Sequence, residues 1–306
     1  MAPRDYISST PSKGVRPMLI LALNDWIKAP QTSVKHIKNL IRLLHDASLL
    51  IDDVQDNSTM RRGKPAAHVI FGAPQALNTG LFMFSQAVRE CQKLKHPRAT
   101  NILIENLECL YLGQSWDLYW KHNLTFPSED DYFTMVDNKT GGMFRMLVQL
   151  LQVEGSFESS AVSAPDLERL ILLLGRFFQV RDDYMNLSSA DYAEQKGFCE
   201  DLDEGKISYL IVRLLAHAPE YKSHITGIFR QLPLGLGQAS GLPYDSKRYI
   251  LDILQSTGTF AATLQYLKDL QAAIEIEISR LEGDLGEQNP MIRLIIANLS
   301  VKELVK

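Results

Sequence analysis

The sequence predicts an all-α protein, and three observations support that prediction. Apolar residues recur every three or four positions along nearly the whole chain, which is the period of an amphipathic helix. Alternating apolar and polar runs bounded by turn residues, the pattern of a strand, are hard to find. With 306 residues, 45% of them hydrophobic, the chain can bury about 75% of its unfolded surface without help from a metal or disulfide. We expect one domain over residues 1–306.

In the amino-terminal half, turn residues separate the predicted helices. Four helices are expected: from the turn at 11–14 to Pro30, over 33–56, from the break at 72–74 to about 96–97, and over 100–120. Asn57 ends the second of them. Acids directly after Ser128 mark a further helix start, since negative charge suits the first helical turn.

The carboxyl-terminal half contains one long helix and a glycine-rich connection. We expect Ser163 to cap a helix over 166–187, in which Gly175 indicates either close helix packing or a tolerated defect. The segment 231–247 is rich in glycine and proline and is predicted to be a flexible connection within the domain. Apolar residues over 248–281 have amphipathic spacing that suits docking on the same bundle or on a partner.

Composition excludes several classes of protein. The net charge of −4 argues against a nucleic-acid binder, which would normally carry a basic stripe. Three scattered cysteines without motif spacing predict reduced thiols rather than disulfides. The amino end lacks the apolar core of a signal peptide, and no stretch approaches eighteen uninterrupted apolar residues. We expect a soluble, cytoplasmic protein without a transmembrane segment.

Two acidic clusters of nearly the same form, Asp-Asp-Val-Gln-Asp and Asp-Asp-Tyr-Met-Asn, each end an apolar helical run. Residues four apart share one helix face, so Asp52 projects with Asp56, and Asp182 with Asn186. Like charges at that spacing oppose a helix by roughly 0.2–0.5 kcal/mol per pair, so the doubled cluster favours a bound cation. Two such clusters facing each other can hold a diphosphate through bridging Mg²⁺.

The alternatives to a magnesium site are weaker. A single cluster of this kind could equally well be a solvated helix face. The presence of two clusters makes that interpretation weaker than a metal site. The Asp-x-Asp-x-Asp-Gly pattern of a calcium loop is missing, and no Cys/His spacing suits zinc.

Basic residues lie close to the first acidic cluster. His45 is seven residues before Asp52, which brings the two within about 20° around a helix, although a lone histidine there is more often a core or solvated residue. Arg61 and Arg62 follow the helix end, where two guanidiniums can fork onto phosphate oxygens. The alternative is that Arg61 and Arg62 are an ordinary basic pair on the surface. This alternative is weaker, because the nearby acids would bring metal and phosphate to the two arginines.

Further cations recur at chain breaks beside glycine, which lets the backbone approach a ligand closely. Each is a weak signal alone, but together they supply enough positive charge for about two diphosphates in a chain of negative net charge. These residues are Lys13, Arg16, Lys139, Lys196 and Lys206.

Four strings of the sequence resemble those of trans-prenyl diphosphate synthases, most closely the fungal geranylgeranyl diphosphate synthases. They are 12–16 (Ser-Lys-Gly-Val-Arg), 44–63, 138–142 (Asn-Lys-Thr-Gly-Gly) and 178–184 (Phe-Gln-Val-Arg-Asp-Asp-Tyr). The resemblance continues to about His217. It implies a bundle of mostly antiparallel helices around a deep cavity, and usually a homodimer.

The resemblance assigns the motif residues to three groups. Lys13, Arg16, His45 and Arg62 match the isopentenyl diphosphate site; Arg61, Lys139, Thr140, Gln179, Lys196 and Lys206 match the allylic diphosphate site; Asp52 and Asp56 match ligands of two Mg²⁺ ions and Asp182 that of a third. Asp53, Asp183 and Asn186 would be supporting partners. Asn186 replaces an acid of many family members, which removes one charge from that metal site.

The implied chemistry is ionisation of an allylic diphosphate, attack by isopentenyl diphosphate and loss of a proton. The catalytic residues would be Asp52, Asp56, Arg61, Lys139, Asp182 and Lys206. Thr140 and Gln179, neutral and polar, suit the border of a carbocation. No side-chain base of obvious placement is present, which is compatible with the family view that the released diphosphate takes the proton.

Product length would depend on what closes the cavity beneath the first cluster. Ala47 and Ser48, one turn before Asp52, are small where fifteen-carbon enzymes tend to have aromatics. Phe84 and Tyr111 match the floor of eukaryotic twenty-carbon synthases, so geranylgeranyl diphosphate is the expected product. Ser85 departs from a bulky residue often seen there, which leaves a twenty-five-carbon product open, and plain core packing is the alternative for both aromatics.

Three other functions compete with that of a prenyl diphosphate synthase. A class I cyclase needs Ser and Glu where this sequence has Asn186 and Ala190, so cyclisation by this chain is set aside. The chain also suits a prenyltransferase domain fused to a terpene cyclase, where an assembly larger than a dimer is expected. A non-catalytic partner subunit is disfavoured because Asp52, Asp56 and Asp182 are all present.

Overall fold

The computed structural model describes residues 1–10, 14–155, 165–189, 198–232 and 241–301. Helices dominate these residues and confirm the all-α prediction. The strands among them are two residues each, β1 (Met60–Arg61) and β2 (Lys64–Pro65), paired antiparallel. The helices are α1 (Ala2–Ser9), α2 (Val15–Ile27), α3 (Gln31–Asp56), α4 (Ala67–Phe71), α5 (Ala73–Cys91), α6 (Ala99–Asn123), α7 (Glu129–Lys139), α8 (Gly141–Glu154), α9 (Glu168–Ser188), α11 (Glu200–Asp203), α12 (Tyr209–His217), the 3₁₀-helix η2 (Pro219–Tyr221), α13 (Lys222–Phe229), α14 (Tyr244–Ser256), α15 (Thr259–Leu285) and α16 (Pro290–Leu299).

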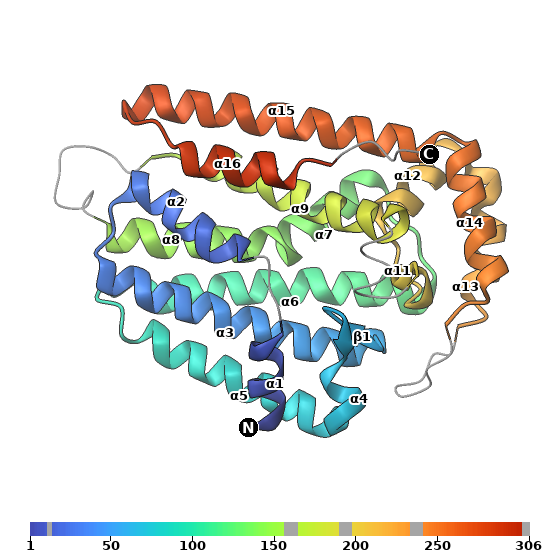
Figure 1. The fold of residues 1–306 in the computed structure, drawn as a ribbon, viewed down its shortest axis with the longest axis horizontal. Helices are drawn as coiled ribbons and strands as arrows, with labels where there is room; N and C mark the ends of the chain where they lie inside the picture. Colours follow the sequence, from blue (N-terminus) through green and yellow to red (C-terminus); the bar gives the residue numbers. More distant parts are fainter. Residues whose placement is uncertain (11–13, 156–164, 190–197, 233–240, 302–306) are drawn as a thin grey trace.

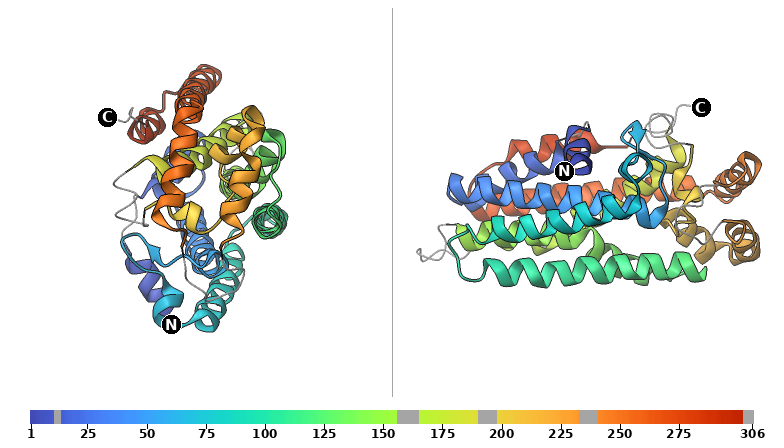
Figure 2. Two further views of the ribbon diagram at one scale, coloured as in Figure 1. Left: turned by 90° about the vertical axis from the view of Figure 1, so that its right-hand side faces the viewer. Right: turned by 90° about the horizontal axis from the view of Figure 1, so that it is seen from below.

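The long helices lie side by side along the longest axis of the molecule (Figure 1). Helix α3 packs against α5 and α8, α9 packs against α8 and α15, and α16 covers α2. Helices α11 to α14 gather at one end of this bundle, and α6 lies at its outer edge (Figure 2, right). Both helices that carry the acidic clusters, α3 and α9, run toward the end where β1 and α11 lie (Figure 1).

Several predicted helix boundaries are confirmed by the local chemistry. Asn57 adopts a left-handed conformation (φ 55°) at the end of α3, and the Ser128 hydroxyl accepts a hydrogen bond from the Asp131 backbone N–H at 3.1 Å at the start of α7. Gly175 reflects close packing, because a Cβ there would lie 3.1 Å from the Cα of Gly141 on the neighbouring helix.

Other boundaries were predicted wrongly. Helix α5 ends at Cys91 instead of 96–97, since the next backbone bonds tighten, with the Lys93 N–H donating to the Glu90 carbonyl at 3.1 Å. The amphipathic stretch 248–281, for which no single helix was predicted, forms two helices separated at Gly258 (φ 71°), and its apolar face docks on the bundle, which was one of the two expectations.

The remaining differences concern three segments. Helix α1 was not anticipated. Helix α14 begins inside the segment predicted to be a flexible connection, and Ser163, the expected helix cap, lies outside the described residues, while Leu167 is the N-cap of α9.

Candidate active site

The first acidic cluster faces a polar stripe on α6. Asp52 accepts a hydrogen bond from the Gln114 side chain at 2.8 Å, and Asp56 accepts one from Lys121 Nζ at 2.9 Å. Between these two α6 residues, Asp117 accepts from Lys139 Nζ at 2.5 Å. The predicted face shared by Asp52 and Asp56 is therefore lined by side chains from α6 and from the end of α7.

The carboxylates in this region are desolvated. Burial raises the pKa of Asp52 to about 6, with the Lys139 charge opposing that rise and the Asp56 charge adding to it. Burial disfavours the charged form of Lys139, but Asp117, Asp52 and Asp56 outweigh it and raise its pKa above the usual value. Lys139 is thus an ammonium held among carboxylates, as expected for a cation of the site.

The second acidic cluster is organised around Asp183, whose side chain is fully buried. One of its oxygens accepts from the Tyr132 hydroxyl at 2.6 Å and the Tyr209 backbone N–H at 2.7 Å. The other accepts from Gln179 Nε2 and Lys206 Nζ, both at 2.9 Å. Four donors therefore surround this carboxylate, which orients Lys206 and Gln179.

The two clusters share one polar region. Burial lowers the pKa of Lys206, yet Asp183, Asp201, Asp182 and, more weakly, Asp117 together raise it well above its usual value. In turn, burial raises the pKa of Asp117, but Lys139 and Lys206 outweigh it and leave the pKa below its usual value. Asp117 of α6 is thus bonded to Lys139 and is also stabilised by the charge of Lys206.

Asp53 faces away from its neighbour Asp52, because consecutive helical residues point about 100° apart. It is fully buried and receives the Arg61 guanidinium, with Arg61 Nε donating at 2.8 Å and Nη2 in contact with the same oxygen. Arg61, assigned to the allylic diphosphate, is therefore bound to a carboxylate in this structure. Asp53 and Asp183 have equivalent roles, since each holds a buried cation beside its cluster.

The residues assigned to the isopentenyl diphosphate form a cationic cluster. Arg16 Nη1 lies 2.8 Å from His45 Nε2, and Arg62 Nη2 lies 3.4 Å from the same atom. Arg62 also donates to the Thr10 hydroxyl at 3.0 Å. Burial and the adjacent arginines lower the pKa of His45 well below its usual value, so the neutral imidazole accepts from the guanidiniums. Lys13 lies outside the described residues.

The polar pair expected to border the carbocation is in direct contact. Thr140 donates its hydroxyl hydrogen to the Gln179 side-chain oxygen at 2.8 Å, and the Gln179 amide nitrogen in turn donates to Asp183. Asn186 is directed elsewhere, since its side-chain oxygen accepts from the Asp201 backbone N–H at 3.1 Å and so holds α11. Lys196 lies outside the described residues.

The residues expected to set product length belong to α3, α5 and α6 and differ in burial. Ala47 is fully buried, Ser48 donates to the His45 carbonyl at 2.8 Å, and the Phe84 and Tyr111 rings are 5.8 Å apart. Ser85 is exposed. Gly80 was not singled out from the sequence, yet a Cβ there would lie 2.8 Å from the Ile51 side chain, so α5 and α3 are closely packed at this point.

Several site residues were missed from the sequence. Gln114, Asp117 and Lys121 have spacings of three and four, so they share one face of α6, a signal that was available but not used. Tyr132 had no comparable signal, because its partner Asp183 lies far away in the chain. Asp201, which is close in sequence to its partner Lys206, was also missed.

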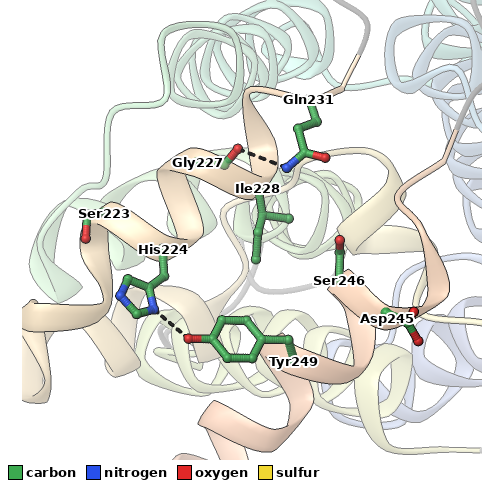
Figure 3. A pocket seen from close by; sticks show the side chains of 8 residues that line it. All are labelled: Ser223, His224, Gly227, Ile228, Gln231, Asp245, Ser246 and Tyr249. Carbon is green, nitrogen blue, oxygen red and sulfur yellow. Dashed lines mark hydrogen bonds between the residues drawn. The ribbon is translucent and has the colours of Figure 1, made fainter.

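A separate pocket of about 500 Å³ lies between α13 and α14 (Figure 3). His224 Nδ1 and the Tyr249 hydroxyl are 2.6 Å apart across it. None of the acidic-cluster residues contributes to its walls. Its lining residues are Ser223, His224, Gly227, Ile228, Gln231, Asp245, Ser246 and Tyr249.

Fold and site together define a helical-bundle protein in which two aspartate clusters and several buried cations share one end of the bundle. The chain belongs to the polyprenyl synthetase family, whose model, described as "Polyprenyl synthetase", matches residues 1–233. This confirms the family resemblance found in the sequence motifs.

Three relatives illustrate the range of similar proteins. Geranylgeranyl pyrophosphate synthase 3 of Zymoseptoria tritici is 44% identical over 97% of this chain and 80% of its own length. Bifunctional terpene synthase FUP1 of Fusarium proliferatum is 54% identical over 98% of this chain and 40% of its own length. Sesterterpene synthase btcA of Colletotrichum orbiculare is 47% identical over 99% of this chain and 43% of its own length. The chain thus spans less than half the length of the last two. Within the described residues, no helix has the length and apolarity needed to cross a membrane.

Proposed function

We propose that this chain is a Mg²⁺-dependent prenyltransferase that condenses isopentenyl diphosphate head-to-tail with dimethylallyl, geranyl or farnesyl diphosphate. The observation that supports this most directly is the polar region at the two acidic clusters, in which Lys139 donates to Asp117 and Lys206 donates to Asp183. Geranylgeranyl diphosphate is the proposed final product, in keeping with the similarity to a geranylgeranyl pyrophosphate synthase.

The donor set suits Mg²⁺, which prefers oxygen ligands and typically takes one or two carboxylates, the rest being substrate phosphates and water. Asp52 and Asp56 would hold two ions and Asp182 a third. Among the described residues no three acidic, imidazole or thiol side chains converge on one point, which suits an ion that completes its shell with diphosphate. When bound, Mg²⁺ supplies positive charge to the diphosphate oxygens.

The cationic side chains have distinct tasks in this proposal. Lys139 and Lys206 stabilise the allylic diphosphate as its carbon–oxygen bond breaks, and Arg61, tied to Asp53, adds a fixed positive charge nearby. Arg16 and Arg62, which share the neutral His45, hold isopentenyl diphosphate. Lys13 and Lys196 are proposed to join these two groups.

The condensation needs no protein side chain as a base. The isopentenyl double bond attacks the allylic carbon, and the released diphosphate takes the proton that leaves the new cation. Thr140 and Gln179 are neutral and hydrogen-bonded to each other, so neither can quench that cation. The apolar walls must exclude water, because water would trap it.

A twenty-five-carbon product, geranylfarnesyl diphosphate, is the second candidate. It is favoured by the similarity to a sesterterpene synthase. Ser85, which was expected to loosen the cavity floor, is exposed and does not contribute to this argument. The similarity to a bifunctional terpene synthase also favours a longer protein in which this chain works beside a cyclase domain.

The decisive experiment incubates the purified chain with Mg²⁺, isopentenyl diphosphate and each allylic starter, and reads product length by chromatography. We expect a twenty-carbon product that disappears when EDTA removes Mg²⁺ and in Asp52→Ala enzyme. A twenty-five-carbon product would replace the first proposal by the second. Absence of condensation with every starter would overturn both and favour a non-catalytic partner subunit.

A further inference from the structure

Lys206 lies at the end of a short hairpin, residues 198–206, which includes α11 and is called the Lys206 hairpin below. Two contacts tie the hairpin to the helices that carry the acidic clusters. Ser58, just after α3, donates to Glu204 at 2.5 Å, and Asn186 of α9 accepts from the Asp201 backbone N–H at 3.1 Å. Within the hairpin, Lys206 Nζ also donates to Asp201 at 3.0 Å.

A third contact comes from the start of α14, outside the acidic clusters. Lys247 of that helix is only 7% exposed, and its Nζ donates to Asp203 at 2.5 Å and to the Phe198 carbonyl at 2.7 Å. The second Asp203 oxygen accepts from the Leu242 backbone N–H at 2.7 Å. Gly241 has no room for a side chain, because a Cβ there would lie 2.5 Å from Asp203. Both ends of the α11 segment are thus held by one buried ammonium.

Helix α14, which carries Lys247, is itself held in place by contacts with α13 and with Phe198. In Figure 3 the Tyr249 ring of α14 meets His224 of α13 across the pocket, with 2.6 Å between hydroxyl and imidazole. Tyr244 stacks on Phe198 with ring centroids 5.4 Å apart. Helix α14 is therefore packed against both α13 and the Lys206 hairpin. A shift of its first turn would also shift Asp203, because Lys247 is bonded to it.

Displacement of Asp203 is transmitted to Lys206 through a tight turn. The Glu204 N–H donates to the Glu200 carbonyl at 2.9 Å, Gly205 has φ 69°, and the Lys206 N–H donates to the Asp201 carbonyl at 2.9 Å. These bonds leave the turn little freedom between Asp203 and Lys206. The position of Lys206 Nζ relative to Asp183 thus depends on where α11 is held.

We propose that Lys247 is a positioning residue, which fixes the Lys206 hairpin through Asp203 and so sets Lys206 for the allylic diphosphate. This inference rests on the proposed function of Lys206. Lys247 itself contacts Asp203 and Phe198 and reaches the site only through the hairpin.

The test measures the affinity for inorganic diphosphate with Mg²⁺ by calorimetry in Lys247→Met, Lys206→Met and the double variant. We expect Lys247→Met to weaken binding by roughly 10- to 100-fold, the loss expected when a charged group is displaced by about 1 Å. The double variant should bind no more weakly than Lys206→Met alone, because Lys247 acts through Lys206. Arg248→Met is the matched control, since the neighbouring Arg248 is exposed and pairs only loosely with Asp252 at 3.8 Å.

Turnover separates positioning from a general loss of folded protein. In Lys247→Met the KM for the allylic diphosphate should rise while the KM for isopentenyl diphosphate stays unchanged. If Lys247→Met does not fold, Asp203→Asn gives the same readouts, because it keeps an oxygen for the Leu242 N–H and removes the charge that meets Lys247.

Two results of the binding experiment overturn the proposal: diphosphate affinity equal to wild type in a variant whose melting temperature has fallen, or losses of affinity that multiply in the double variant. Binding is measured without turnover, so a chain that binds diphosphate through Lys206 but does not condense substrates refutes the proposed function alone. A chain that condenses normally in Lys247→Met refutes this inference alone.

Discussion

At the scale of single residues, each acidic cluster divides its two adjacent aspartates between two tasks. Asp52 and Asp182 lie toward the shared polar region, whereas Asp53 and Asp183 are fully buried and hold Arg61 and Lys206. Adjacent residues on a helix point about 100° apart, so one carboxylate can meet ligands while the next orders a cation.

This division predicts opposite effects from neighbouring substitutions. Asp183→Ala would leave the buried Tyr132 hydroxyl without its acceptor and Lys206 with Asp201 as its remaining carboxylate, so we expect the unfolding free energy to fall by about 3 kcal/mol. Asp182→Ala, at a side chain that is only partly buried, should lower it by less than Asp183→Ala does but slow condensation roughly 100- to 1,000-fold. Urea denaturation and steady-state kinetics on both variants check this pair. Equal losses of stability would contradict the assignment.

At the scale of secondary-structure elements, the spacing of α3 from α5 decides how much room lies beneath the first cluster. Gly80 permits close packing of the two helices, since a Cβ there would overlap the Ile51 side chain. Further along α5, Phe84 is half-buried and meets the Tyr111 ring of α6 at 5.8 Å, whereas Ser85 is exposed. Of these two neighbours, Phe84 is the one directed toward the helix interface.

We therefore predict that Phe84→Ala lengthens the product by at least one five-carbon unit, because removing the ring opens space between α5 and α6. Ser85→Ala is the control and should leave product length unchanged, since its side chain is exposed. Reversed-phase chromatography of the hydrolysed products distinguishes the two. An unchanged product from a folded Phe84→Ala variant would show that these aromatics are plain core packing.

At the scale of the whole molecule, α5 and α6 expose several large apolar side chains, and we call the surface that they form the α5–α6 face. Monomeric proteins rarely leave such a surface in water, so we expect a second copy of the chain to cover it. Its outward position is visible for α6 at the edge of the bundle (Figure 2). The exposed residues are Leu81, Phe82 and Val88 of α5 and Ile104, Tyr111, Leu112, Trp116 and Tyr119 of α6.

A charge in the α5–α6 face should split the expected homo-oligomer. Leu112, 57% exposed, would carry that charge in Leu112→Glu, and burying an unpaired carboxylate at an interface is strongly unfavourable. Light scattering should report monomers for Leu112→Glu and the wild-type mass for Leu294→Glu, whose site on α16 is 61% exposed and lies outside the face. A wild-type mass in Leu112→Glu would place the interface elsewhere.

Much of this protein was readable from the sequence because helical periodicity and capping are local. The period of apolar residues determined the all-α fold and the faces of α3 and α9, and Asn57 and Ser128 marked helix ends by side-chain chemistry that acts within one turn. The family motifs named the aspartates and cations of the site. None of this required knowledge of which helices pack together.

Only the tertiary structure decided which of those groups meet. That Lys139 donates to Asp117, that Lys206 donates to Asp183 and that Lys247 holds Asp203 depends on helix packing, because these partners lie tens of residues apart. Spacing along a helix determines the direction of a side chain, but the group that it meets is set by whichever helix covers that face.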